Sequence, residues 1–388
     1  MGFDLASARA DTPACLDQIF LDSAGSSLPP QPVLDTVIAH LRREAEIGGY
    51  RAANEADVDQ GYPLFAELLG CEPDEVAFSD SAARAWLSAY DAVPLGPGDR
   101  VLVTEVEYAG QAAPMLHTAA RVGASVELVP STPSGEVDVE ALRGMLDERV
   151  KLVSLVHVPT NGGLVNPVRE VADAAHEVGA LLFLDACQST GQVPVSARET
   201  GADVISGTGR KWLRGPRGTG FLVVRAAARA KLEPRLIDLH SAEWSDLDQV
   251  KLRDDARVFE LWECSVAARL GLFAAARYLL DIGVETVAAE VAARAERLRA
   301  GLAEIPGVTV RDLGGTRCGI VTFTKEGVSA HQLRDTLRAE GVTVTVSDRS
   351  STRYDMTRRG LHEMVRASPH YFVSDEQIDG AVARVAAG

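Results

Sequence analysis

The stretch that decides the fold is SGTGRKWLRGPRGTGFLVV, residues 206–224. It contains five glycines and a single lysine, Lys211, shortly before the apolar run FLVV. Most lysines are solvated surface cations, which is the simplest interpretation of this one. Glycine-rich turns at strand ends, however, let the backbone approach a bound ligand closely. The segments on both sides of the stretch decide between these two interpretations.

Short apolar runs alternate with helix-period segments from residue 31 to about 225. Because these runs are apolar on both faces, they predict a mostly parallel sheet covered by helices on both sides, and hence an α/β fold class. In such sheets the functional residues gather at the carboxyl ends of the strands. The predicted strands are VLVTEVE (101–107), KLVSLVHV (151–158), LLFLDA (181–186), DVISG (203–207) and FLVV (221–224).

The pattern changes past about residue 265, where long alanine- and arginine-rich helical stretches begin. They are followed by the runs VTVRDL, GIVTFTK and VTVTVS, with a helix expected near 329–340 and another at the end. This α+β order predicts a second, smaller domain. We expect a large domain over residues 20–265 and a small domain made of residues 1–19 and 266–388.

Composition excludes several classes of function. The net charge of −16 would repel a nucleic acid, and no basic stripe offsets it. The five cysteines form no CxxC pair, so we expect neither a metal site nor disulfides, and a reducing cytoplasm fits best. The N-terminus is acidic where a signal peptide would be basic and then apolar, and no run of about 18 apolar residues occurs. We therefore expect a cytoplasmic protein that binds no membrane.

Asp185 and Lys211 form the first candidate pair. Asp185 ends the apolar run LLFLDA, where a buried carboxylate is costly unless a cation lies near it. Taken alone it could equally cap the next helix. Lys211 follows the next strand, so neighbouring strand ends would place the two on opposite sides of one crevice. Such a crevice suits a flat cationic heterocycle held at its ring nitrogen by a carboxylate and at its aldehyde by an amine, as pyridoxal phosphate would be.

Three further positions fit the same ligand. Gln188 could donate to the ring hydroxyl, and Tyr108 could stack on the ring. The segment AFSDSAARAW (77–86) offers a phosphate the start of a helix, with Ser79, Ser81, Ala82 and Ala83. Each position also has a plainer interpretation, as a helix-start residue, a core aromatic or an ordinary serine cap. A P-loop is excluded because Trp212 follows Lys211 where that motif needs Ser or Thr.

Five motifs together make the sequence resemble the class V aminotransferase group of fold-type I pyridoxal phosphate enzymes. This group includes cysteine desulfurases, isopenicillin N epimerase-like proteins and the ergothioneine-pathway carbon–sulfur lyase. The likeness covers nearly the whole chain and implies a seven-stranded, mostly parallel sheet between helices, followed by a smaller C-terminal α+β domain. The motifs are FLDSAGSSLPPQPV (20–33), HVPTNGGLVNP (157–167), LDACQSTGQ (184–192), GRKWLRGPRGTG (209–220) and VRASPHYFVSDEQID (365–379).

The resemblance implies a role for each matched residue. Lys211 would form the Schiff base with the cofactor and, once freed as an amine, remove the Cα proton. Asp185 would partner the pyridine nitrogen, Gln188 the ring oxygen, and Tyr108 would replace the usual stacking histidine. Arg366 would bind the substrate α-carboxylate through its guanidinium fork, although a solvated Arg366 is the plainer alternative.

The phosphate site departs from the usual family pattern. The resemblance assigns it to Ala82, Ala83, Thr208 and Arg210, and Arg210 stands where desulfurases commonly have histidine. Trp262 and Glu263 occupy the places of a Gly-Thr pair that a partner subunit often supplies, which puts that shared contact in doubt. The asparagine of the family pattern corresponds to Thr160, with Asn161 beside it, so the two are joint candidates.

A desulfurase needs a mobile thiol in the loop before the VRAS motif. Here that loop reads VSDRSSTRYDMTRRGLHEM (346–364) and lacks cysteine, and we expect Cys187 to lie behind the cofactor. These features argue against persulfide-forming desulfurase activity. The stretch REAEIGGYRAANEA (43–56) resembles that of ergothioneine-type lyases, which places Tyr50 and Arg51, together with Ala24, at the substrate. Arg353 and Tyr354 are either substrate-selecting or ordinary surface residues.

The favoured activity is β-elimination from an S-substituted cysteine, a carbon–sulfur lyase reaction. The alternatives are transamination, epimerisation, or decarboxylation with oxidative deamination in a secondary-metabolite pathway. A non-catalytic binding module is a further alternative, against which the joint presence of Lys211, Asp185, Gln188 and Arg366 argues. The family also implies a homodimer.

Overall fold

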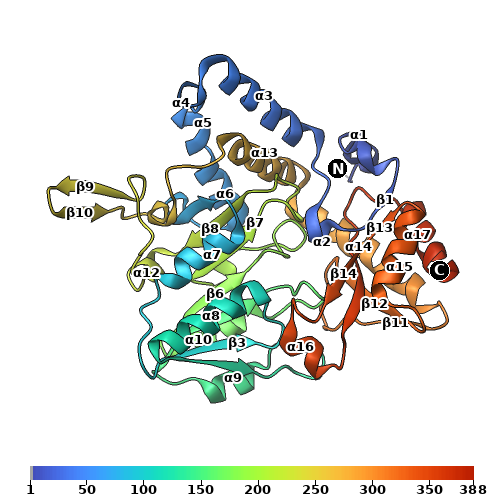
Figure 1. Cartoon of the computed structure of the whole chain (residues 1–388). Coiled ribbons are helices and arrows are strands. Elements are labelled where there is room, and N and C mark those ends of the chain that lie inside the picture. The colour runs from blue at the N-terminus through green and yellow to red at the C-terminus, as the bar shows by residue number, and fades with distance from the viewer. Residues whose placement is uncertain (1–2) are drawn as a thin grey trace.

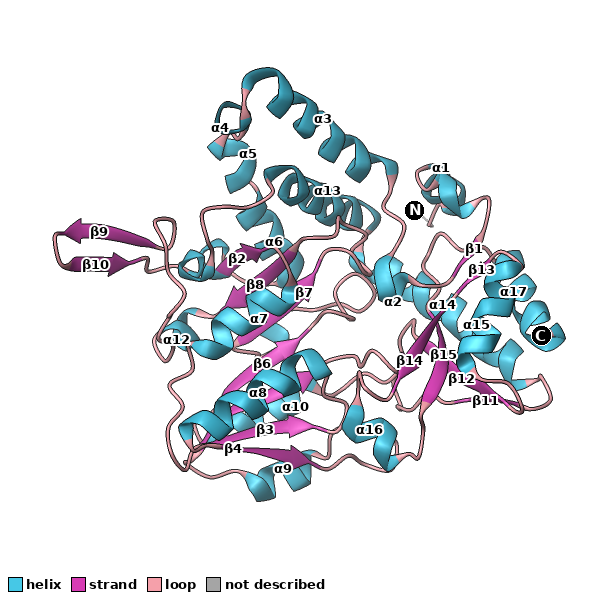
Figure 2. Ribbon diagram, in the orientation of Figure 1, coloured by secondary structure: helices cyan, strands magenta, loops and turns pink. Residues whose placement is uncertain are grey.

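The structure is a computed structural model and describes residues 3–388. A seven-stranded sheet forms its centre, with the strand order β2-β8-β7-β6-β5-β3-β4 (Figure 1, Figure 2). Strands β4, β3, β5, β6 and β7 run parallel, whereas β8 is antiparallel to both of its neighbours. This sheet confirms the predicted α/β class. The strands are β2 (Val76–Ser79), β3 (Arg100–Thr104), β4 (Ser125–Val129), β5 (Val150–Val156), β6 (Leu181–Asp185), β7 (Val204–Thr208) and β8 (Gly220–Val224).

The two faces of the sheet bury alternate residues of the same strands. Val101 and Val103 of β3 belong to one apolar cluster, which also holds Trp86, while Leu102 belongs to the other. Because both faces are covered, the strands read as continuous apolar runs in the sequence. The helices around the sheet are α6 (Gly61–Leu69), α7 (Ala82–Asp91), α8 (Ala109–Val122), α9 (Val139–Met145), α10 (Val168–Glu177), α11 (Ala197–Thr200) and α12 (Ala226–Arg229).

One predicted strand is too long. The run VLVTEVE was expected to remain extended to residue 107, but β3 ends at Thr104. The chain turns there, because the Glu107 amide donates to the Thr104 carbonyl. The turn brings the side chain of Glu107 into the protein interior, where it is 1% exposed.

The C-terminal part contains a second, four-stranded antiparallel sheet in the order β11-β12-β15-β14. Strand β1 (Ile19–Phe20) pairs with β13 (Val342–Thr343), and Asp22 bridges to Ser368, so the N-terminal segment joins this part. Its elements are α1 (Leu5–Ala10), η1 (Pro13–Cys15), α14 (Val284–Ala303), β11 (Val308–Val310), β12 (Val321–Lys325), α15 (Ala330–Ala339), β14 (Thr345–Asp348), α16 (Arg353–Arg358), β15 (Glu363–Ala367) and α17 (Asp375–Ala387).

Helix α13 (Val266–Ile282) lies against α3 (Gln31–Ile47) and α6 rather than on the small sheet. The domain boundaries at residues 20 and 265 stay a prediction. The remaining elements are α2 (Ser23–Ser26), α4 (Gly49–Ala52), α5 (Glu55–Asp59), η2 (Pro73–Glu75), β9 (Ala242–Asp246), β10 (Gln249–Leu252) and η3 (Ala256–Phe259). Strands β9 and β10 form a hairpin that projects away from the body of the molecule (Figure 1).

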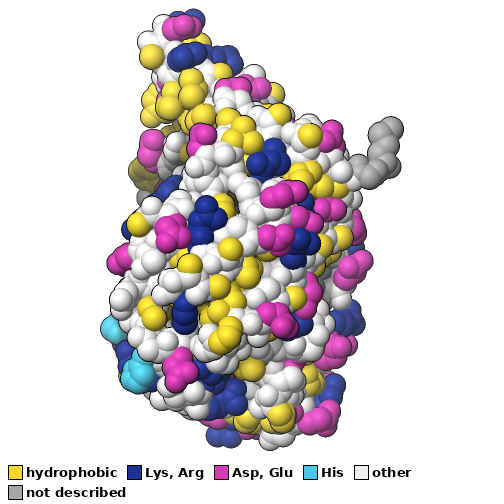
Figure 3. Space-filling view, turned by 90° about the vertical axis from the view of Figure 1, so that its right-hand side faces the viewer, with side chains coloured by type: hydrophobic (Ala, Val, Ile, Leu, Met, Phe, Trp, Pro, Cys, Tyr) yellow, Lys and Arg dark blue, Asp and Glu magenta, His cyan; other side chains and the backbone are white. Residues whose placement is uncertain are grey.

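Lys, Arg, Asp and Glu side chains are interspersed over the face on the side of the small sheet (Figure 3). This mixture agrees with the absence of a basic stripe in the sequence. Within residues 3–388, no helix combines the length and the apolar character needed to cross a bilayer.

Gly191 lets the turn after Lys211 pack closely on the chain that follows β6. Its φ is +101°, a value that favours glycine, and an added Cβ would overlap with the backbone of Trp212 and Leu213. Gly218, in the same glycine-rich stretch as Lys211, has a φ of +77° but faces open space. The two glycines therefore separate the cost of backbone conformation from the cost of a steric clash.

We expect Gly191→Ala to lower the free energy of unfolding more than Gly218→Ala. The second change costs about 1–2 kcal/mol for the left-handed backbone, and the first adds about 1–3 kcal/mol for overpacking. Urea denaturation of both variants measures the difference. Equal losses would show that the turn after Lys211 does not pack against residue 191.

Candidate active site

The carboxyl ends of neighbouring strands surround one cavity. It has a volume of about 160 Å³, which is room for on the order of ten water molecules. Its walls come from the start of α7, the start of α8, and the segments that follow β5, β6 and β7. The lining residues are Ser81, Ala82, Ala83, Trp86, Tyr108, Gly110, Gln111, Val156, Val158, Thr160, Asp185, Cys187, Gln188, Thr208, Arg210 and Lys211. The sheet edge predicted for the functional residues is therefore where they gather.

Lys211 lies three residues beyond the end of β7 and faces this cavity. Within residues 3–388, no hydrogen bond or ion pair engages its amine nitrogen. Burial lowers the pKa of Lys211 below its ordinary value, and the nearby Arg210 and Arg366 guanidinium groups lower it further, while Asp185 opposes them. A lysine whose neutral amine is favoured in this way is a nucleophile and a base.

Asp185 faces the same cavity from the end of β6 and is 7% exposed. Its Oδ1 accepts from the Cys187 amide at 2.8 Å, and its Oδ2 accepts from Gln111 Nε2 at 2.7 Å. These bonds fix the direction in which the carboxylate points. An anion held in this way suits a cationic ring nitrogen.

Glu107 lies behind Asp185 as a second buried carboxyl group. Its Oε2 accepts from Ser154 Oγ at 2.8 Å, and its Oε1 accepts from the Tyr108 amide at 2.9 Å. Burial raises the pKa of Glu107 to about 8, and the nearby Asp185 carboxylate adds to this rise. At neutral pH Glu107 therefore holds a proton and adds no negative charge beside Asp185.

The N-terminus of α7 supplies the expected anion-binding end of the cavity. Ala82 and Ala83 line it, and the Ser81 side chain accepts from the Arg84 amide, so that hydroxyl is occupied as an ordinary N-cap. The carbonyl of Gly25 accepts from the Arg210 guanidinium. A helix N-terminus beside a guanidinium attracts a phosphate, which suits the expected ligand.

Gln188 lines the cavity, but its amide is engaged on both sides. Its Nε2 donates to the Ala24 carbonyl at 3.1 Å and to Thr160 Oγ1 at 3.3 Å, and its Oε1 accepts from Trp212 Nε1 at 2.9 Å. Tyr108, at the start of α8, is 42% exposed and lines the wall. The roles of Gln188 and Tyr108 toward a ring stay predictions.

Arg366 lies on β15 of the small sheet and is 8% exposed. Its two terminal nitrogens donate to Thr160 Oγ1 at 2.7 Å and to Asp22 Oδ1 at 3.2 Å. Burial lowers the pKa of Arg366 and raises the pKa of Asp22, so both groups are shifted toward neutrality despite their attraction. Arg366 Nε is buried without a partner among the described residues. The predicted carboxylate-binding group thus lies one hydrogen bond away from the cavity wall at Thr160.

Several predicted residues lie away from the cavity. Asn161 is buried and donates to Asp355 Oδ2 at 2.8 Å, so of the joint candidates only Thr160 lines the wall. Tyr50 is 82% exposed on α4, at the outer end of α3 (Figure 1). Tyr50 and Arg51 do not line the cavity within one chain, because α3 packs on α13 and directs them outward. Ala24 contributes its carbonyl to Gln188 instead of lining the cavity.

The segment expected to be a loop before the VRAS motif contains helix α16 instead. Its Asp355 amide donates to the Glu105 carbonyl at 3.0 Å, and Arg358 pairs with Glu105 Oε2 at 2.8 Å. The Ser351 carbonyl accepts from the Ala109 amide at 2.9 Å. These bonds fasten the segment to the large sheet. Tyr354 packs against the core and Arg353 is exposed, and neither lines the cavity.

Sequence reasoning missed two partners of the predicted residues. Gln111 was detectable, because it stands three residues after Tyr108 in the first turn of α8 and so points to the same side. Asp22 lay within a quoted motif, but its pairing with Arg366 joins residues at opposite ends of the chain. No local pattern indicates such a pair.

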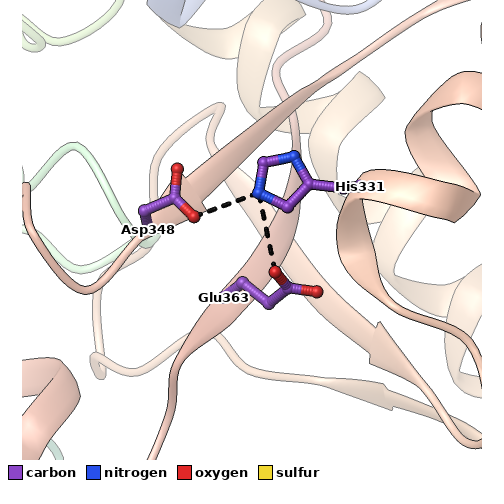
Figure 4. Close-up of side chains that lie close together, drawn as sticks. All are labelled: His331, Asp348 and Glu363. Atoms are coloured by element: carbon purple, nitrogen blue, oxygen red, sulfur yellow. Dashed lines mark hydrogen bonds and ion pairs between the residues drawn. The ribbon is translucent and has the colours of Figure 1, made fainter.

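A separate group of ionisable side chains joins helix α15 to strands β14 and β15 of the small sheet (Figure 4). His331 Nε2 is 3.2 Å from Asp348 Oδ1 and 3.5 Å from Glu363 Oε2. Arg334 donates to His331 Nδ1 at 3.1 Å, so the hydrogen of a neutral imidazole resides on Nε2 and points at the carboxylates. Contacts within the protein thus explain why His331, Asp348 and Glu363 lie close together. None of the three lines the cavity described above.

The cavity as a whole fits pyridoxal phosphate. The unbonded amine of Lys211 and the oriented carboxylate of Asp185 face one space, with the N-terminus of α7 at its edge. The buried donors and acceptors there match an aldehyde, a ring nitrogen and a phosphate.

Glu107 generates a testable pH dependence. Its pKa is about 8 in the folded chain and about 4.3 in an unfolded one, so the proton it holds stabilises the fold below that lower value. The contribution is lost as pH rises toward 8, at up to about 1.4 kcal/mol per pH unit. We expect cofactor-free Glu107→Gln to lose less stability than the unmodified chain between about pH 5 and pH 8 in urea unfolding. Glu170→Gln, at an exposed position of α10, is the control, and identical pH slopes for all three would contradict the burial argument.

Comparisons with known proteins agree with this geometry. The model of the family "Aminotransferase class-V" matches residues 19–380. A probable cysteine desulfurase of Halobacterium salinarum is 30% identical over 98% of this chain and 96% of its own length. A probable cysteine desulfurase 2 of Mycobacterium leprae is 31% identical over the same shares. The apo structure of a cysteine desulfurase from Thermococcus onnurineus NA1 superposes with a TM-score of 0.91 and 24% identity, covering 100% of this chain and 98% of that one. The chain belongs to the class V aminotransferase family of pyridoxal phosphate-dependent enzymes.

Proposed function

We propose that the protein is a pyridoxal phosphate-dependent carbon–sulfur lyase that acts on an S-substituted cysteine. The observation that carries the proposal is the pairing of an unbonded Lys211 amine with Asp185 in one cavity, next to a segment that holds no thiol. The relatives named cysteine desulfurase indicate chemistry at a cysteine C–S bond. The rest of the site determines where the sulfur goes.

The cysteines of this chain give no sulfur acceptor suited to a desulfurase. Helix α16 and its flanks, which occupy the place of the thiol-bearing loop, lack cysteine and are fastened to Glu105. Cys187 lines the cavity, but burial raises the pKa of its thiol well above the ordinary value, so it remains protonated. Sulfur therefore leaves on the small molecule, as a free thiol.

The residues of the chain divide the reaction between them. Arg366 binds the substrate α-carboxylate through its guanidinium fork, which lies one hydrogen bond from the cavity wall at Thr160. When bound, the cofactor would supply an electron-withdrawing ring, and Asp185 would hold its ring nitrogen. Lys211 takes the Cα proton, the Cβ–S bond breaks, and the thiolate leaves with the bonding electrons. Hydrolysis of the three-carbon remainder then yields pyruvate and ammonia.

We further propose that the enzyme works as a homodimer in the cytoplasm. Strands β9 and β10 pair with each other in a two-stranded sheet of the described chain. An isolated two-stranded hairpin is marginally stable in water, and apolar side chains on it favour contact with a second protein surface. Because the family implies a homodimer, we infer that the protein in contact with the hairpin is a second copy of the chain. The exposed apolar residues on and beside the hairpin are Leu239 (72%), Trp244 (75%), Leu247 (89%) and Val250 (56%).

The lyase proposal is tested with an S-alkyl cysteine. We expect a free thiol and pyruvate in equal amounts, detected by thiol titration and mass spectrometry. Lys211→Ala should lower the rate by about 10²–10⁴-fold because it removes the general base. Lys231→Ala is the control, since that lysine bonds the Gly179 carbonyl at an exposed position.

Other products would assign another reaction. A keto acid that keeps the sulfur substituent would indicate transamination, and loss of α-chirality alone would indicate epimerisation. Carbon dioxide with consumption of oxygen would indicate decarboxylating oxidative deamination. A persulfide on the protein would restore the desulfurase interpretation, and cofactor binding without any turnover would indicate a binding module.

The dimer is tested by removing the apolar surface of the hairpin. We expect the unmodified protein to have twice the 41.3 kDa chain mass in light scattering. The double variant Trp244→Ser/Leu247→Ser should weaken association by at least about tenfold, because buried aromatic residues dominate interface energies. Leu16→Ser removes an apolar residue that is 60% exposed elsewhere, near the N-terminus, and is the control. A dimer unaffected by the double variant would place the interface on another surface.

A further inference from the structure

Arg214 is a buried cation that pairs with no carboxylate among residues 3–388. Its side chain is 1% exposed, although burying a charge is costly unless partners replace its water. The hydrogen bonds of its guanidinium go to neutral groups: Nε donates to the Leu28 carbonyl at 2.9 Å, and the terminal nitrogens donate to Tyr371 Oη at 2.6 Å and Thr12 Oγ1 at 2.5 Å. Nothing in the reaction proposed above uses this residue.

Aromatic rings surround the same guanidinium. Its carbon lies 4.6 Å from the ring centre of Phe372, 5.0 Å from that of Tyr371 and 6.0 Å from that of Tyr278. Ring faces stabilise a desolvated cation, and arginine stacks on them better than lysine does. Arg214 therefore joins the N-terminal segment, helix α13 and the segment after β15 at one point.

The backbone at Arg214 is directly tied to Lys211. The Arg214 amide donates to the Lys211 carbonyl at 3.0 Å and closes the turn that begins at the lysine. With a φ of +62°, Arg214 is the one non-glycine residue of the described chain in the left-handed region. Such a conformation costs about 1–2 kcal/mol and persists where surrounding contacts impose it.

A second bond holds the same turn from the small-sheet side. His370 is fully buried, and its Nε2 lies 2.9 Å from the Trp212 carbonyl. His370 and Tyr371 follow Arg366 on the chain by four and five residues, at the end of β15. The strand that carries the substrate-binding arginine and the turn that carries the lysine are thus connected through adjacent residues.

We propose that Arg214 is a positioning residue, whose side chain fixes the turn at Lys211 so that the amine points into the cavity. The proposal rests on the assignment of Lys211 as the cofactor-binding lysine. A purely conformational role would be fulfilled by glycine, which adopts positive φ without strain. A role of the side chain would not be fulfilled by glycine, nor by lysine, which lacks the planar fork.

The test measures attachment of the cofactor to Lys211 rather than turnover. Cofactor-free enzyme is mixed with pyridoxal phosphate, the bond is reduced with borohydride at set times, and peptide mass spectrometry gives the modified fraction of Lys211. We expect Arg214→Gly and Arg214→Lys to slow this attachment by at least about tenfold, since hydrogen bonds to a charged group are lost. The pH at which the visible absorption of the bound cofactor changes should also shift in both variants.

Arg294→Lys is the matched control. Arg294 is 5% exposed, bonds the Val373 carbonyl and stacks 5.8 Å from the Phe3 ring centre, but does not touch the turn at Lys211. We expect it to lower stability in urea while leaving the attachment rate unchanged within about twofold. Tyr371→Phe removes one hydrogen bond of Arg214 and replaces the Arg214 variants if these fail to fold. We expect this variant to slow cofactor attachment as well.

Attachment at the unmodified rate in Arg214→Gly would overturn the proposal, and so would equal slowing in Arg294→Lys. Failure of the unmodified protein to attach the cofactor at Lys211 would overturn the proposed function itself. The two failures are distinguishable because the unmodified chain is measured beside each variant.

Discussion

The adjacency of β6 and β7 is the constraint on which the site depends. The two strands run parallel, with Asp185 paired to Ser206 in register, so their carboxyl ends open on the same side of the sheet. The carboxylate follows directly from one strand and the lysine follows the other after a short turn. The pairing of these strands brings their carboxyl ends together, and Asp185 and Lys211 place an anion and an amine there.

The charges at this edge are controlled by burial more than by pairing. Burial lowers the pKa of Lys211 and the pKa of Arg366. It raises the pKa of Glu107, which therefore holds its proton. Burial of these groups strengthens their remaining interactions, because the dielectric constant around them is lower than in water. Two donors orient the Asp185 carboxylate at the cavity.

The sequence predicted those parts of the molecule that local pattern determines. Each of these parts is a short continuous segment that can be recognised from its own residues. They are the strand before Asp185, the strand before Lys211 and the start of α7. The turn at Glu107 was missed because Val106 continues the alternation of the strand, although the glutamates on either side of it are uncommon in strands. The pairs Asp22–Arg366 and Arg214–Thr12 join distant segments, which no periodicity reveals. Tyr50 and Arg51 lie outside the cavity of one chain, and their place at the substrate stays a prediction.

The contacts of Arg214 also constrain when the site can form during synthesis of the chain. The guanidinium bonds Thr12, which precedes the large sheet in the sequence, and Tyr371, which follows β15. A ribosome releases the N-terminal residues first, and domains fold as they emerge. The large sheet can therefore assemble on a nascent chain before Tyr371 has been synthesised, while the turn at the lysine still lacks this bond. If Arg214 positions the lysine as proposed, uptake of the vitamin-derived cofactor waits until the segment after β15 has joined the fold.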